Sequence, residues 1–181
     1  VNTVTVNSHY PANVAVREDG SFFVVWVGIT EEASSPGLTR ENYDVYGQWF
    51  GPSGERLGDN FLVSVDNSGN QTRPRVVSNR QGASLVVWQG RIPNARGHWR
   101  VGGQIYDPQR APLGGNLLLD WPGHSWKSLR PLVGLSDDNL AVVLWDGAAN
   151  YEDDSHYGLF LRIFKIEDPE NYKISLIDAY T

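Results

Sequence analysis

The sequence predicts an all-β protein built from three four-stranded antiparallel repeats. The first observation behind this prediction is an apolar run ending in Trp-x-Gly that occurs three times, as FFVVWVG at 22–28, SLVVWQG at 84–90 and AVVLWDG at 141–147. The second is that no segment shows a sustained 3.6-residue apolar period with helix caps, so we expect almost no helix.

Other residues fall into register when the Trp-x-Gly runs are aligned. A proline precedes each repeated tryptophan by 14 or 15 positions, and GQWF at 47–50, GQIY at 103–106 and LRIF at 161–164 follow it. Three units of about 60 residues therefore account for nearly the whole chain. We expect one repeat domain over 1–181, with repeat 1 at about 1–65, repeat 2 at about 66–120 and repeat 3 at about 121–181.

Each repeat is expected to contain four strands in the same order, because short β-branched and aromatic runs alternate with Gly, Pro, Asn and Asp. The first strands are expected at 13–16, 75–77 and 132–135, and the second strands are the Trp-bearing runs. The third strands are expected at 44–50, 101–106 and 158–164, and the fourth at 60–65, 116–120 and 173–178.

The second strand is apolar on both of its faces. In FFVVWV at 22–27, both alternating sets of side chains are apolar, so neither face of the strand can meet water. Four-stranded meanders covered on both sides are typical of propeller blades stacked around an axis. The repeated tryptophans, Trp26, Trp88 and Trp145, are then expected to pack between blades. The glycines that follow, Gly28, Gly90 and Gly147, are expected to let the chain leave the sheet at a cramped point.

A family resemblance rests on repeats 1 and 2. The stretches VNTVTVNSHYPANVAVREDGSFFVVW and DVYGQWFGPSGERLGDNFLVSVDNSGNQTRPRVV resemble tandem repeats of large secreted or surface-attached bacterial proteins. The third repeat resembles them less, because LRIF replaces the Gly-Gln pair and SDDN replaces Asp-Gly. The resemblance implies a propeller-like array that is secreted or on the cell surface, and it carries no catalytic residue.

Three blades are too few for an ordinary propeller ring, which has 4 to 8. One solution is a homodimer in which two chains complete a six-bladed ring. Another is a β-trefoil, in which the twelve strands close within one chain. A β-sandwich, or an excerpt from a longer array, is also compatible with the pattern.

The longer connections gather at one edge of such an array. In a four-stranded meander, the connections from strand two to three and from strand four to the next repeat leave at the same end, which makes that edge the candidate binding face. Its unrepeated tryptophans have polar neighbours in sequence, a combination suited to the C–H faces and hydroxyls of a sugar. The predicted ligand-binding residues are Arg96, His98, Trp99, Trp121, His124 and Trp126. Alternatively, these tryptophans pack in the core or a subunit contact.

The remaining features limit the function. A net charge of −6 argues against a nucleic-acid partner, and no apolar run is long enough to insert into a membrane. Glu152, Asp153 and Asp154 could hold Ca²⁺, although a solvated acidic loop explains them as well; no other cofactor or metal is expected. No motif for catalysis appears, so we predict that the chain is not an enzyme.

The function predicted from these features is a noncatalytic extracellular recognition module, lectin-like, with a glycan or cell-surface partner. A structural or adhesive self-assembly unit of a bacterial surface protein is one alternative. A carbohydrate-active enzyme is the other.

Overall fold

A computed structural model describes residues 10–35, 38–65, 69–91, 99–120, 127–148, 157–168 and 173–180. Every regular element in these ranges is a β-strand. In this part of the chain there is accordingly no helix with the length and apolar character needed to cross a membrane. The prediction of an all-β chain is confirmed.

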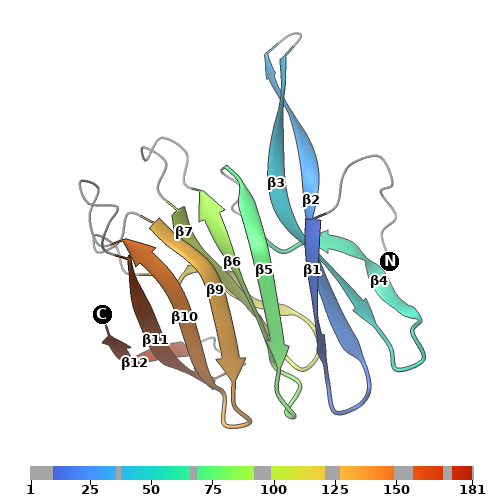
Figure 1. The fold of residues 1–181 in the computed structure, drawn as a ribbon. Helices are drawn as coiled ribbons and strands as arrows, with labels where there is room; N and C mark the ends of the chain where they lie inside the picture. The colour runs from blue at the N-terminus through green and yellow to red at the C-terminus, as the bar shows by residue number, and fades with distance from the viewer. Residues whose placement is uncertain are drawn as a thin grey trace.

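Each repeat is a four-stranded antiparallel meander, as the sequence predicts (Figure 1). Repeat 1 comprises β1 (Tyr10–Val16), β2 (Phe22–Ser35), β3 (Leu38–Phe50) and β4 (Arg56–Leu62). Repeat 2 comprises β5 (Gln71–Ser78), β6 (Ser84–Arg91), β7 (Trp99–Tyr106) and β8 (Pro112–Leu118). Repeat 3 comprises β9 (Lys127–Leu135), β10 (Leu140–Ala148), β11 (Tyr157–Asp168) and β12 (Lys173–Tyr180).

The meanders form two open sheets. Repeat 1 is one sheet, and repeats 2 and 3 are joined into an eight-stranded sheet by a single parallel pair between Trp99 and Lys127. A β-trefoil would close its twelve strands, whereas the described strands leave both sheets open. The trefoil alternative is therefore not supported.

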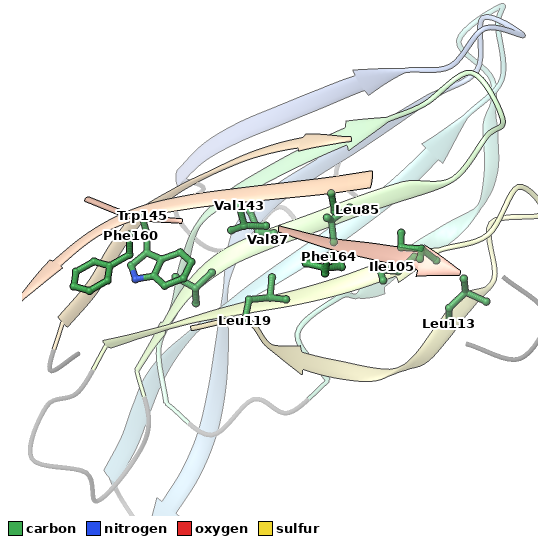
Figure 2. Close-up of a cluster of buried hydrophobic side chains, with 12 residues drawn as sticks. Leu85, Val87, Ile105, Leu113, Leu119, Val143, Trp145, Phe160 and Phe164 are labelled. Carbon is green, nitrogen blue, oxygen red and sulfur yellow. The ribbon is translucent and has the colours of Figure 1, made fainter. Parts of the chain in front are cut away.

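The three repeats stack face to face. Their first strands, β1, β5 and β9, lie side by side in Figure 1. One apolar cluster joins repeats 1 and 2, with Phe23, Val25 and Trp49 on one side and Val86, Trp88 and Tyr106 on the other. A second cluster joins repeats 2 and 3, with Leu85, Val87 and Ile105 on one side and Val143, Trp145 and Phe164 on the other (Figure 2). Each large side chain buried in this way contributes roughly 1.5–3 kcal/mol of transfer free energy.

The repeated tryptophans are all buried, as predicted, but they do not all lie between repeats. Trp88 and Trp145 belong to the two clusters that join neighbouring repeats. Trp26 instead lies on the face of repeat 1 that points away from repeat 2, where its ring stacks with Tyr46 at 6.3 Å. It is nevertheless only 5% exposed.

The β2–β3 hairpin is much longer than expected. The sequence predicts strands only at 22–28 and 44–50, but the two strands remain paired from Phe22 with Phe50 out to Ser35 with Leu38, and the hairpin extends beyond the other strands (Figure 1). Backbone pairing does not require apolar side chains. The mostly polar residues at 30–35 and 38–42 therefore continue the strands without showing the alternation by which a strand is recognised in sequence.

The glycines after the repeated tryptophans lie near the end of the strand in two repeats but not in the first. β6 ends one residue after Gly90 and β10 one residue after Gly147, whereas β2 continues from Gly28 to Ser35. Their contacts are nevertheless as close as predicted: a Cβ on Gly28 would lie 2.8 Å from the Tyr46 ring, and one on Gly147 would collide with the carbonyl oxygen of Lys127. These glycines therefore permit close packing around the strand that bears the repeated tryptophan.

Five tight connections at the opposite edge share one geometry. In each, the N–H of the first residue donates to the carbonyl of the fifth, and the N–H of the fourth donates back to the first; the five turns begin at Arg17, Gly51, Asn79, Asp107 and Ser136. Their fourth residues all have positive φ, namely Gly20, Gly54, Gly82, Arg110 and Asn139. Asn139 thus takes the place of glycine in SDDN, because Asn tolerates the left-handed region.

Candidate functional site

The predicted binding face is the edge where the longer connections leave the strands. Trp99 begins β7, is half-buried, and pairs through its backbone with Lys127, the first residue of β9. The connections that enter β7 and β9 therefore meet the described strands at adjacent points. The other predicted ligand-binding residues lie outside the described residues; they are Arg96, His98, Trp121, His124 and Trp126.

The predicted calcium ligands, Glu152, Asp153 and Asp154, also lie outside the described residues. Within the ranges that are described, no group of three or more His, Asp or Glu side chains is placed to hold a metal ion. A calcium site at 152–154 stays a prediction.

A buried ion pair links β7 and β9 at this edge of the molecule. Asp120, which is fully buried, accepts hydrogen bonds from Nε of Arg100 at 2.6 Å and from Oγ of Ser128 at 2.8 Å. Burial lowers the pKa of Arg162 on β11, and the neighbouring Asp120 carboxylate opposes that effect. Because Asp120 interacts with side chains from β7, β9 and β11, we assign the cluster a structural role in joining repeats 2 and 3.

A groove of about 520 Å³ opens between the outer strands of repeats 1 and 2. One wall comes from β3 and β4, and the other from β7, β8 and the turn between them. The lining is mostly apolar and aromatic, with a few polar groups. The lining residues that matter for its chemistry are Trp49, Leu57, Asp59, Phe61, Tyr106 and Arg110.

Trp49 is a rigid part of the groove wall. Its ring stacks with Phe23, with centroids 3.9 Å apart, and the Arg17 guanidinium lies over it, 4.3 Å from the centroid. Arg17 is held in place by its hydrogen bonds to the carbonyls of Pro108 at 3.0 Å and Asp107 at 3.2 Å. Since both faces of the Trp49 ring are covered, this side chain shapes the groove and does not offer a stacking surface.

Tyr106 and Phe61 contribute the other aromatic surfaces. The Tyr106 ring is edge-on to Trp49 at 5.9 Å and lies 5.9 Å from the half-buried Phe61. Burial raises the pKa of Tyr106, so its hydroxyl is protonated at neutral pH. No hydrogen bond to this hydroxyl is found among the described residues. A polar atom in such a position is ordinarily satisfied by water or by a ligand.

Arg110 stands at the rim with a strained backbone. Its φ is 74°, at the position where the matching turn of repeat 1 has Gly54 with a φ of 85°. The left-handed region costs a residue with a side chain about 1–2 kcal/mol. Asp59, on the β4 wall, is the only carboxylate among the described lining residues.

The groove is not predicted from the sequence, although two signals for it are present. Trp49 is a tryptophan outside both the repeated position and the long connections, and repeat 2 has Ile105 in its place. Arg110 occupies a turn position that is glycine in repeat 1. Both signals are departures from the repeat, and both residues lie on the groove.

Comparison with known proteins gives no family. No protein-family model matches the chain, and no curated protein matches it significantly. A solved structure from Parabacteroides distasonis, provisionally named a glycoside hydrolase, aligns with 96% of this chain and 72% of its own at a TM-score of 0.39 and 10% identity. A glycosyl hydrolase from Bacteroides ovatus aligns with 96% of this chain and 70% of its own, at 0.38 and 10%. A provisionally named glycosidase from Bacteroides thetaiotaomicron aligns with 96% and 72%, at 0.38 and 11%.

These neighbours correct one prediction. All three are named as hydrolases of glycosides, so the prediction that the chain is not an enzyme is withdrawn. Their TM-scores are too low for a fold or an activity to be carried from them to this chain, and we assign no reaction to it.

Proposed function

We propose that this chain binds a carbohydrate in the groove between repeats 1 and 2. The observation that carries the proposal is Arg110, a strained residue at the rim of the groove where the equivalent turn has glycine. Backbone strain that persists at a cleft is typical of functional sites, because selection for stability alone would remove it. Glycine at position 110 would relieve the strain and would also remove the guanidinium from the rim.

The groove has the mixed chemistry that a sugar requires. Phe61 and Leu57 present apolar surface to the C–H face of a pyranose ring. The Tyr106 hydroxyl, the Asp59 carboxylate and the Arg110 guanidinium supply donors and acceptors for sugar hydroxyls. Binding to an extracellular glycan is part of the same proposal.

Two variants test the groove with little risk to the fold. A glycan array identifies the ligand, and titration calorimetry then measures its affinity for each variant. Tyr106→Phe removes only the hydroxyl and is expected to reduce affinity about tenfold, equivalent to about 1.4 kcal/mol, with no change in Tm. Arg110→Gly is expected to reduce affinity by at least as much while raising Tm.

Arg56→Ala is the matched control, because Arg56 is an exposed arginine of repeat 1 that does not line the groove. It should bind the glycan as the parent does. Unchanged affinity in both groove variants, or an array on which no glycan binds, would overturn the proposal.

A further inference from the structure

Neighbouring repeats always meet through the same two faces. Within the chain, one face of each repeat meets the opposite face of the next repeat. The first of these faces bears Val25 in repeat 1 and Val87 in repeat 2, and the second bears the repeated tryptophan of the next repeat. We call the first the trailing face and the second the leading face. The contact is apolar at both joints.

Repeat 1 has a leading face that meets no described residue of another repeat. Val14 pairs with Val24, and Val16 pairs with Phe22, so these side chains lie on the same face as Trp26. Val14 is 55% exposed and Val16 is 65% exposed. The residue of repeat 2 that matches Val14 is Val76, which is 4% exposed because repeat 1 covers it.

Repeat 3 has a trailing face that likewise meets no described residue of another repeat. Leu132 pairs with Leu144, and Leu159 pairs with Asp146 two residues along the same strand, which places these side chains on one face. Leu132 is 56% exposed and Leu159 is 67% exposed. The open face of repeat 3 thus corresponds to the face of repeat 2 that is buried against repeat 3.

We propose that the open trailing face of repeat 3 binds the open leading face of repeat 1 in a second copy of this chain. This contact between two chains would reproduce the contact between a trailing face and a leading face that one chain already makes twice. A contact of two different faces is heterologous, and it closes only if the last free face meets the first. Two copies supply six repeats, within the range of 4 to 8 that closes a propeller, whereas three repeats do not.

The proposal is independent of the groove, and its first test is the molar mass. Sedimentation equilibrium of the whole chain is expected to give twice the monomer mass of 20.2 kDa. Val16→Asp places a charge on the open leading face, and Leu159→Asp places one on the open trailing face. In a closed dimer each of the two contacts contains one leading and one trailing face, so either variant should be monomeric. Both residues are exposed, so circular dichroism should show an unchanged fold.

A mixture of the two variants distinguishes the head-to-tail arrangement from a contact between like faces. Val16→Asp keeps an intact trailing face and Leu159→Asp keeps an intact leading face, so an equimolar mixture should form a heterodimer through one joint. Leu118→Asp, at an exposed leucine of β8 away from both faces, should leave the dimer intact. A parent chain that sediments as a monomer at 100 µM, or a Leu159→Asp variant that stays dimeric, would overturn the proposal.

Discussion

The indole Nε1 of Trp88 donates a hydrogen bond of 3.0 Å to the side-chain carbonyl of Gln71. Trp145 occupies the same position one repeat later, but its Nε1 is buried and has no hydrogen-bond partner among the residues that the structure describes. The difference follows from the residue that replaces the glutamine. Ser128 stands at that position in repeat 3, and its shorter side chain donates to Asp120 instead. The two contacts between repeats are therefore similar in their apolar packing, but only the first provides a hydrogen bond for the indole N–H of its tryptophan.

This difference predicts unequal effects of one substitution at the two tryptophans. Trp88→Phe removes the hydrogen bond and leaves the Gln71 acceptor buried without its donor, whereas Trp145→Phe removes an N–H that has no described partner. The free energy of unfolding should fall more for Trp88→Phe, by about 1–3 kcal/mol. Urea denaturation of both variants measures it. Equal losses at the two sites would show that the hydrogen bond contributes nothing net.

Removal of the whole Trp88 side chain should be far more costly. The ring is 3% exposed and packs directly on Gly102, where an added Cβ would lie 2.6 Å from it. Trp88→Ala is therefore expected to lower the free energy of unfolding by about 3–5 kcal/mol, through lost burial and a cavity. Trp99→Ala, at a half-buried residue, is the comparison and should cost much less. A Trp88→Ala protein that melts within a degree or two of the parent contradicts this account.

Arg110 offers a prediction with the opposite sign. Arg110→Gly replaces a strained residue with one that adopts a φ of 74° freely, and the gain is partly offset by the greater freedom of glycine in the unfolded chain. We expect a net stabilisation of about 0.5–1 kcal/mol, measured by thermal denaturation. Gly54→Ala, at the matching turn, should destabilise by about 1 kcal/mol. Destabilisation by Arg110→Gly would mean that contacts of the arginine outweigh its strain.

The repeat register explains why so much of the fold is predictable. Aligning Trp26, Trp88 and Trp145 places all twelve strands, because burial on both faces of the second strand imposes the same apolar pattern in each repeat. The same register does not reveal the long β2–β3 hairpin, whose pairing depends on backbone groups that carry no sequence pattern. Nor does it reveal the groove, which forms only where Phe61 of one repeat faces Tyr106 of the next. Contacts between repeats depend on how the sheets are stacked, and the period of a single strand does not contain that information.

Asp19 provides a prediction about pH. Its Oδ1 accepts hydrogen bonds from Oγ of Ser21 at 2.6 Å and from the backbone N–H of Ser21 at 2.9 Å. The hydroxyl donor is the main reason that the pKa of Asp19 lies below its usual value, and the backbone donor adds to it. Since folding lowers this pKa, the carboxylate favours the folded state. Its contribution is complete above the pKa of the unfolded chain and is lost as the pH falls through the folded pKa.

Ser21→Ala tests this assignment because it removes the hydroxyl and keeps the backbone donor. Carbon-detected NMR titration of the Asp19 carboxyl should show that its pKa rises toward the ordinary aspartate value in the variant, while remaining below it. The stability of the variant relative to the parent should then be lowest above that value and approach the parent's as the pH falls and both carboxyls become protonated. An Asp19 titration that is identical in the two proteins would show that the Ser21 hydroxyl does not hold the carboxylate in solution.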